Sequence, residues 1–241
     1  MTRVEGHTGL QSVVLEDLSD AVNYRRWLVD LAMPHLTGPA LEIGSGTGDY
    51  AEEWAGRGVQ MTASEADPGR LAALHARFAE HAGVAVRELA VPVDVQADYA
   101  TVVAINVLEH IPDDVAALEA FGRLLRPGGR AVLLVPALPA LFSRFDRAIG
   151  HQRRYRRRDL VEVLRHAGLV VEKVHYVNAP GVIPWFVGMR LLRLTPHAGP
   201  LLRLWDRIVV PIACRLERRW RPPIGQSLFA VARRPVSQSE G

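Results

Sequence analysis

The segment 39-PALEIGSGTG-48 decides the fold of this chain. Residues 40–43 predict a short buried strand that runs directly into Gly44, Gly46 and Gly48, and residues 49–57 predict a helix that opens from this turn. Glycines let a ligand approach the backbone closely, and a helix N-terminus offers unpaired N–H donors. The dinucleotide fingerprint would need a glycine at position 49, where an aspartate stands. A carboxylate there suits a pyrophosphate badly, whereas Glu42 suits a ligand that carries an ammonium group.

Outward from this turn, short strands and helices alternate along the chain. Strands are predicted at 60–64, 84–88, 99–106, 130–136, 169–177 and 227–233, and helices at 69–81, 113–125 and 159–166. This alternation is typical of a doubly wound, mostly parallel sheet, here an α/β Rossmann-like sheet of seven strands with helices on both faces. A helical segment at 13–37 precedes the first strand. The segment 126–129 is interpreted as a breaker and 137–158 as a basic loop.

The composition favours one globular domain over residues 1–241. The chain is 49% hydrophobic and 23% charged with a formal net charge of +3, which excludes a disordered chain. The single cysteine excludes an internal disulfide and a multi-cysteine metal site, and we expect a cytoplasmic protein without a metal. All basic residues except Lys173 are arginine, but a charge this small does not by itself indicate nucleic-acid binding. The apolar stretches are too broken to span a bilayer, which needs about 20 apolar residues.

Glu65 is the second candidate for ligand binding. It stands 21 residues after Gly44, at the end of the predicted second strand. An acidic side chain at this interval from a glycine turn can accept hydrogen bonds from both hydroxyls of a ribose. The alternative is a solvated carboxylate at a strand end.

Four segments together resemble the class I S-adenosylmethionine (SAM)-dependent methyltransferases, in particular the small-molecule type 11/12-like group. They are the glycine motif 42–48, the acidic strand end 64–68, the segment 106-NVLEHI-111 and the segment 124-LLRPGGR-130. In this order and at these intervals they are strongly specific for the fold and cofactor. They say little about the substrate.

The resemblance implies a role for each matching position. SAM would be the cofactor, S-adenosylhomocysteine (SAH) the product, and Glu65 would hold the ribose. Glu42 would orient the ammonium group, the glycine motif would border the methionine part, and Asn106 and Val107 would lie beside the sulfonium, with His110 close to the transferred methyl group. The full set of implied cofactor-binding residues is Tyr24, Glu42, Gly44, Ser45, Gly46, Gly48, Glu65, Ala66, Glu88, Leu89, Asn106, Val107 and His110. The match is weak at Glu88 and Leu89, where the family usually has an aspartate.

The predicted loop 137–158 carries the candidates for substrate chemistry, because ligands of a doubly wound sheet bind outside the carboxyl ends of its strands. His110, His151 and Tyr155 are the candidate catalytic residues, with either histidine as a general base and Tyr155 as a hydrogen-bond partner. Arg153 or Arg154 could clamp a carboxylate. Two alternatives stay open: His110 only braces the cofactor loop, or the whole segment is a solvated basic loop. We expect no nucleic acid here, because no stacking platform accompanies the arginines.

The segment 178–226 is predicted to be a hydrophobic helical cap inserted before the last strand. It is rich in leucine, tryptophan and arginine. We rank lining of a substrate pocket first, with Trp185 as a substrate contact, homodimer contact second and membrane-surface contact third.

These features predict a SAM-dependent methyltransferase for a small molecule with an apolar body and an acidic or polar end. O-methylation in bacterial specialised metabolism is the leading hypothesis. The alternatives are N- or C-methylation, or a cofactor-binding protein or cyclase on the same fold that transfers no methyl group. An NAD-dependent oxidoreductase is disfavoured by the glycine spacing.

Overall fold

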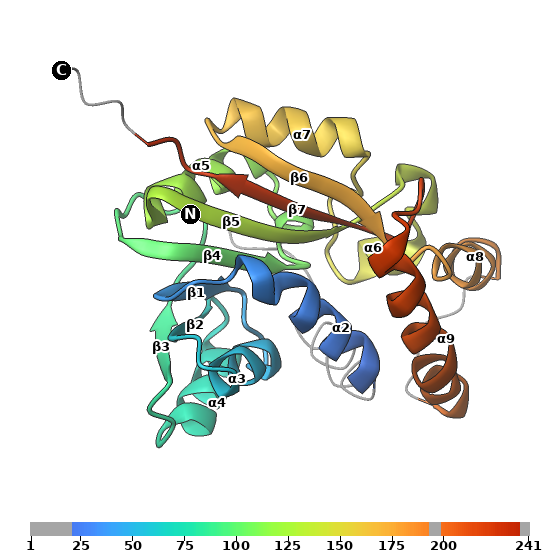
Figure 1. Cartoon of the computed structure of the whole chain (residues 1–241), viewed down its shortest axis with the longest axis horizontal. Coiled ribbons are helices and arrows are strands. Elements are labelled where there is room, and N and C mark those ends of the chain that lie inside the picture. Colours follow the sequence, from blue (N-terminus) through green and yellow to red (C-terminus); the bar gives the residue numbers. More distant parts are fainter. Residues whose placement is uncertain (1–20, 193–198, 237–241) are drawn as a thin grey trace.

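The computed structural model describes residues 21–192 and 199–236, which build one seven-stranded sheet (Figure 1). The strand order is β3-β2-β1-β4-β5-β7-β6, and β7 runs antiparallel to both of its neighbours. The strands are β1 (Ala40–Ile43), β2 (Met61–Glu65), β3 (Val84–Glu88), β4 (Tyr99–Ile105), β5 (Leu125–Pro136), β6 (Val170–Val177) and β7 (Ser227–Arg233). The predicted Rossmann-like fold with one antiparallel strand is confirmed.

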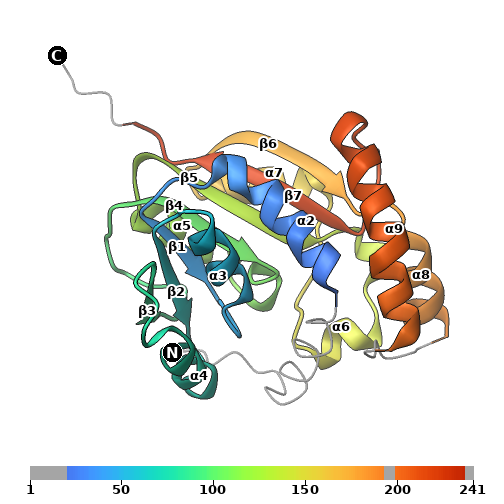
Figure 2. The ribbon, with the colours of Figure 1, turned by 60° about the horizontal axis from the view of Figure 1, so that its bottom comes forward.

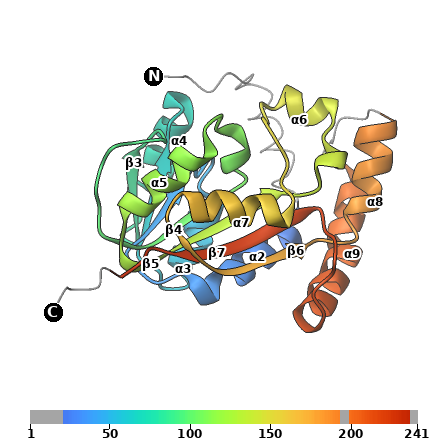
Figure 3. The ribbon, with the colours of Figure 1, turned by 90° about the horizontal axis from the view of Figure 1, so that it is seen from above.

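The two faces of the sheet are covered by different helices because side chains alternate along each strand. Leu41 and Ile43 of β1 pack with α5 (Asp114–Leu124) and α7 (Arg157–His166). Ala40 packs on the opposite face with α2 (Val22–Ala32), α3 (Asp49–Gly56) and α4 (Pro68–Phe78). Seen from above, α5 and α7 lie on the near face of the sheet (Figure 3). Both faces are therefore buried, as the continuous apolar strands require.

Several element bounds differ from the sequence-based prediction. The segment 13–37 contains α2 followed by a short 3-10 helix at Met33–His35, and its residues 13–20 lie outside the described part of the chain. The predicted helix 69–81 is α4, which begins at Pro68 and ends at Phe78. The predicted loop 137–158 contains a 3-10 helix at Pro139–Leu141 and α6 (Arg144–Ala148). A capping box between Ser143 and Asp146 starts α6.

The predicted helix 113–125 stops before the segment 126–129, as expected, because α5 ends at Leu124. The strand predicted at 130–136 begins earlier than expected, since β5 starts at Leu125 and runs through this segment. A Cβ atom on Gly129 would lie only 2.9 Å from the Arg126 carbonyl oxygen and 3.0 Å from the Tyr99 carbonyl oxygen. The glycine thus allows β5 to approach β4 closely at this point. Here it continues a strand rather than ending one.

The segment between β6 and β7 is helical, as predicted. It contains α8 (Val182–Trp185), the π-helix η4 (Phe186–Leu191) and α9 (Pro200–Arg219). Figure 2 shows α9 beside α8 at the edge of the molecule, with α2 between α9 and the sheet. Asp206 of α9 caps the start of α2, accepting hydrogen bonds from the backbone N–H groups of Asn23 (2.9 Å) and Tyr24 (2.8 Å). No described helix is long and apolar enough to cross a membrane.

Candidate active site

The glycine turn after β1 is built by backbone conformation. Gly44, Gly46 and Gly48 all have positive φ angles, of 67°, 57° and 88°. A Cβ atom on Gly44 would come within 2.9 Å of Val107 Cγ2, so the residue that follows β4 closes against the turn. Only glycine adopts this conformation at little cost. The turn therefore presents bare backbone at the carboxyl end of β1.

Hydrogen bonds tie this turn to the end of β2. Ser45 N–H donates to the Ser64 carbonyl oxygen (2.8 Å), and the Ser64 hydroxyl donates to the Glu42 carbonyl oxygen (2.6 Å). The Glu65 carboxylate is buried and accepts hydrogen bonds from the backbone N–H of Gly46 (3.0 Å) and of Ala66 (2.9 Å). The structure thus brings the glycine motif and Glu65 together. Glu65 has acceptor capacity left for a further donor.

Glu42 is a buried carboxylate directly beneath the turn. Its side chain is only 2% exposed, and Oε2 has no hydrogen-bond partner. Burial raises the pKa of Glu42 to about 7, and the nearby Glu65 acts in the same direction. Burial also raises the pKa of Tyr50, and the charges of Tyr24 and Glu42 contribute in the same direction. A buried acid with one unpaired oxygen needs a cationic or hydrogen-bonding partner there. The ammonium group of SAM fits this need.

The remaining predicted cofactor residues stand at the neighbouring strand ends. Glu88 pairs in register with Glu65, and Leu89 N–H donates to the Glu65 carbonyl oxygen (3.1 Å). Asn106 follows β4 with a φ of 54°, an uncommon conformation for a residue other than glycine. All these positions therefore lie along one edge of the sheet, at the ends of β1 to β4.

His151 is held by a buried carboxylate. Its Nδ1 lies 3.0 Å from Asp146 Oδ1, and Asp146 is fully buried. Burial alone would raise the pKa of Asp146, but the hydrogen bond from His151, the charge of Arg154 and the hydrogen bond from Ser143 lower it to about 2. An ionised Asp146 fixes the proton of neutral His151 on Nδ1 and leaves Nε2 as the basic nitrogen. Asp146 thus joins the candidate functional residues, in addition to those that the sequence predicts.

His110 and Glu109 lie against this nitrogen. The rings of His110 and His151 are 4.6 Å apart, edge to face, and the Nε2 atom of His151 is 3.7 Å from Glu109 Oε1. Burial lowers the pKa of His110 to about 3, with His151 acting in the same direction, and burial raises that of Glu109 to about 7. Candidate ligand atoms of the three residues all lie within 4.8 Å of one another, so this set could hold a divalent ion. His110 is a much weaker base than an ordinary histidine.

The other predicted loop residues have internal partners. Arg153 pairs with Asp114 Oδ2 (2.6 Å), and the buried Tyr155 donates its hydroxyl to the same oxygen (2.9 Å). Arg154 is 5% exposed, pairs with Asp146 Oδ1 (2.7 Å) and stacks 4.5 Å from the ring centre of Trp185. Three of these four residues thus hold the loop, and Trp185 connects it to the cap. Their catalytic and substrate-binding roles stay predictions.

Comparison with known proteins identifies the class that this fold and site define. A family model described as a methyltransferase domain matches residues 19–174. The chain therefore belongs to this methyltransferase family, and it is a class I SAM-dependent methyltransferase with SAM as its cofactor.

Curated relatives match part of the chain. The ubiquinone biosynthesis O-methyltransferase of Pectobacterium carotovorum is 34% identical over 96 residues, which cover 37% of this chain and 39% of that protein. The enzyme of the same name from Aeromonas salmonicida is 31% identical over 114 residues, 44% of this chain and 47% of that protein. The matches thus span less than half the length of these relatives.

Solved structures share the fold at low identity. A putative methyltransferase in complex with a methyltransferase activator from Haloferax volcanii has a TM-score of 0.65 at 14% identity, covering 98% of this chain and all of that one. A geranyl diphosphate methyltransferase bound to SAM scores 0.60 at 16% identity, covering 86% of this chain and 84% of that one. The [4+2]-cyclase SpnF scores 0.58 at 20% identity, covering 88% and 81%.

Proposed function

We propose that this enzyme methylates a hydroxyl group of a small molecule with an apolar body, with His151 as general base. The observation that carries the proposal is the Asp146–His151 pair, at 3.0 Å, on the candidate substrate loop. The curated relatives are O-methyltransferases by name, which supports oxygen as the acceptor atom.

The cofactor is assigned to the strand ends in this proposal. Glu42 binds the ammonium group, Glu65 the ribose hydroxyls, and the glycine turn borders the methionine part. Asn106, Val107 and His110 stand at the methyl end, Glu88, Leu89 and Ala66 at the adenosine end, and Tyr24 covers the cofactor. When bound, SAM supplies a methyl group on a sulfonium and is converted to neutral SAH.

His151 activates the acceptor. As the acceptor oxygen forms its bond to the methyl carbon, Nε2 of His151 takes the hydroxyl proton, and the Asp146 carboxylate stabilises the resulting imidazolium. His110, with its pKa near 3, stays neutral and keeps the ring of His151 in place. Alignment of oxygen, methyl and sulfur supplies the rest of the catalysis.

The pairing of the arginines favours a hydroxyl over a carboxylate acceptor. A carboxylate needs no base but needs a cation to bind it. Arg154 holds Asp146 and Arg153 holds Asp114, so both candidate clamps already bind internal carboxylates. The Asp146–His151 pair, in contrast, is what a hydroxyl acceptor requires. An acidic end is thus the less supported part of the substrate prediction.

The proposal is tested with a panel of apolar phenols, hydroxy acids, carboxylic acids and amines, each incubated with SAM labelled with carbon-13 in its methyl group. The chemical shift of the transferred carbon distinguishes oxygen, nitrogen and carbon acceptors. We expect hydroxyl compounds to be methylated and the corresponding acids lacking a hydroxyl to be inert. Exclusive methylation of carboxylates or amines would refute the proposal.

With the best acceptor, His151→Asn is expected to lower kcat by about a hundredfold or more, the usual contribution of a general base. SAM affinity should stay the same. His166→Asn changes an exposed histidine at the end of α7 and is the control. An unchanged kcat in His151→Asn would remove His151 from the mechanism.

A second candidate is a protein that binds the cofactor without transferring its methyl group. The structural similarity to a [4+2]-cyclase favours including it. It predicts no SAH formation with any acceptor, despite SAM binding. We also propose that the protein is cytoplasmic, which the single cysteine supports. We further propose that it has no nucleic-acid partner.

A further inference from the structure

The outer side of α9 is a stripe of exposed aliphatic side chains. Leu201, Leu204, Ile208, Ile212 and Leu216 recur at intervals of three or four residues, which places them on one side of the helix. Their exposed fractions are 81%, 55%, 51%, 52% and 61%. We call these five residues the cap face. Soluble proteins rarely expose a contiguous apolar surface of this kind unless it binds something.

The cap face points outward because the opposite side of α9 is anchored to the domain. Asp206, Val210 and Ala213 are the buried residues of the helix, and Asp206 caps α2. Glu217 accepts hydrogen bonds from the backbone N–H groups of Asn178 (3.0 Å) and Ala179 (2.9 Å). The helix therefore cannot turn its apolar stripe inward without breaking these contacts.

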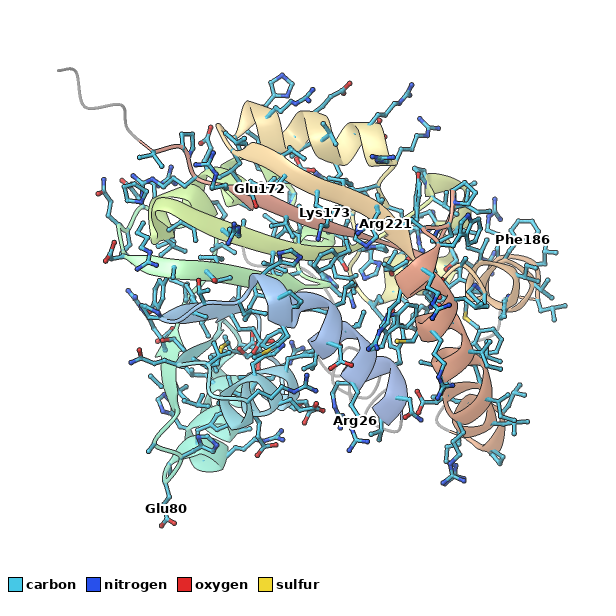
Figure 4. The ribbon with its side chains drawn as sticks, viewed as in Figure 1. Arg26, Glu80, Glu172, Lys173, Phe186 and Arg221 are labelled. Carbon is cyan, nitrogen blue, oxygen red and sulfur yellow. The ribbon has the colours of Figure 1, made fainter. Side chains whose placement is uncertain are left out.

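The adjacent helices extend the apolar surface. Ile183 of α8 is 72% exposed, and Phe186 and Leu191 of η4 are 42% and 59% exposed. Figure 2 shows α8 beside α9, and Figure 4 shows the Phe186 side chain projecting away from the molecule. The exposed apolar side chains thus continue from α9 onto α8 and η4.

The exposed charges of α9 itself have one sign, and one of its arginines, Arg218, pairs with Asp30 of α2 at 3.2 Å. Arg203, Arg207, Arg215, Arg218 and Arg219 of α9 are all exposed. Within α9 the acidic residues are Asp206 and Glu217, and both are committed to the contacts that anchor the helix. An apolar strip edged by arginines matches a bilayer interface that carries anionic lipid headgroups.

We propose that the cap face binds the surface of an anionic membrane, with α9 lying parallel to it. A second copy of this chain fits less well, because a symmetric contact would bring two sets of arginines together without exposed acids on α9 to pair with them. The apolar side chains would insert among the upper parts of the acyl chains, and the arginines would contact the headgroups. This binding does not depend on the proposed function.

Helix α8, which lies beside α9, contacts the candidate substrate loop. Trp185 at the end of α8 donates its indole N–H to the Leu141 carbonyl oxygen (3.2 Å) and packs edge to face on Phe145 of α6 (5.8 Å). Membrane binding would therefore hold the loop close to the lipid surface. If the proposed function is correct, the substrate class that benefits is an amphiphile whose hydroxyl group reaches out of the lipid phase.

The experiment is co-sedimentation of the full chain with vesicles of phosphatidylcholine alone or of an equal mixture of phosphatidylcholine and phosphatidylglycerol. We expect binding to the mixed vesicles, weakened by salt. The variant Leu204→Glu/Ile208→Glu should bind them about tenfold or more weakly, because both apolar contact and charge complementarity are lost. Val95→Glu/Val170→Glu introduces the same change at exposed valines elsewhere and should bind as the unchanged protein does.

Retained thermal stabilisation by SAM shows that the variants are folded, independently of any acceptor. Failure of the unchanged protein to sediment with mixed vesicles would overturn the proposal, as would equal binding by the cap-face variant. A dimer in light scattering that Leu204→Glu/Ile208→Glu converts to a monomer would also overturn it, and would assign the cap face to self-association.

Discussion

The glycine turn and the loop 137–158 form the two sides of the candidate site, and they are held in place by different means. The turn is a backbone structure, fixed by three positive φ angles and by hydrogen bonds to the end of β2. The loop is fixed by buried side-chain charges, with Asp146 accepting from His151, Arg154 and Ser143. The first arrangement accepts one constant cofactor. The second can change with a few substitutions, which suits the part of the enzyme that meets the substrate.

The largest effect is expected from the charge at the centre of the loop. Asp146→Asn leaves the buried Arg154 guanidinium without its carboxylate, and we expect a loss of about 3–5 kcal/mol in the free energy of unfolding. Denaturant unfolding measures it. Glu172→Gln removes an exposed carboxylate that pairs with Arg130 and Arg233, and should cost less than about 1 kcal/mol. Equal losses in the two variants would show that the loop does not depend on its buried charges.

On the turn side, the buried Glu42 carboxyl has a raised pKa, so its effect on stability should depend on pH. The pKa of Glu42 in the folded state, about 7, lies above its ordinary value of 4.5. The folded protein is therefore most stable below pH 4.5, where Glu42 is protonated in both states, and this stability is lost as the pH rises through about 7. Without cofactor, Glu42→Gln should therefore gain about 3 kcal/mol relative to the unchanged protein between about pH 5 and about pH 8.

Unfolding midpoints and denaturant curves at several pH values, without cofactor, measure this difference. Glu80→Gln, at an exposed position after α4, is the matched control. A constant difference between Glu42→Gln and the unchanged protein across the range would contradict the assignment of Glu42 as a buried acid with one unpaired oxygen.

A smaller effect is expected from a single Cβ atom in the turn. Gly44→Ala forces alanine into a positive φ and against Val107, a cost of about 1–3 kcal/mol that should appear as weaker SAM binding. Adding Val107→Ala removes the contact but not the backbone strain, so it should restore part of the affinity. Calorimetric titration with SAM measures both. An unchanged SAM affinity in Gly44→Ala would show that the turn does not require glycine at this position.

The smallest effect is expected from removing metal ions. Glu109, His110 and His151 could hold an ion, but the proposed mechanism uses His151 as a base and needs its Nε2 free. Activity after exhaustive treatment with EDTA should therefore be unchanged. If EDTA abolished activity and Zn²⁺ or Mn²⁺ restored it, the three residues would be a metal site, and His151 would not be the general base.

The sequence was sufficient for the fold and the cofactor because both depend on local signals. Each of these signals depends on residues that are close in sequence: a glycine triplet, an acidic strand end and alternating apolar runs. The loop was less predictable, because the partners of Arg153, Arg154 and Tyr155 are carboxylates at positions 114 and 146, whose proximity depends on tertiary structure. Asp146 stands five residues before His151, and that interval was the one available signal for their pairing. The predicted start of the strand 130–136 was wrong because glycine serves close strand packing as well as turns.

The cap on the start of α2 has a consequence for regulation. Asp206 belongs to the helix that carries the cap face, yet it fixes the backbone of Tyr24, the residue assigned to cover the cofactor. Two ligands that act on one shared contact are thermodynamically linked, and such linkage is reciprocal. Suppose that lipid contact strengthens the hydrogen bonds between Asp206 and the start of α2, and thereby strengthens SAM binding. Bound SAM must then strengthen lipid binding by the same factor. The enzyme would then bind SAM more tightly at the membrane, where its acceptor lies. It would bind the membrane more weakly once SAM has left the site.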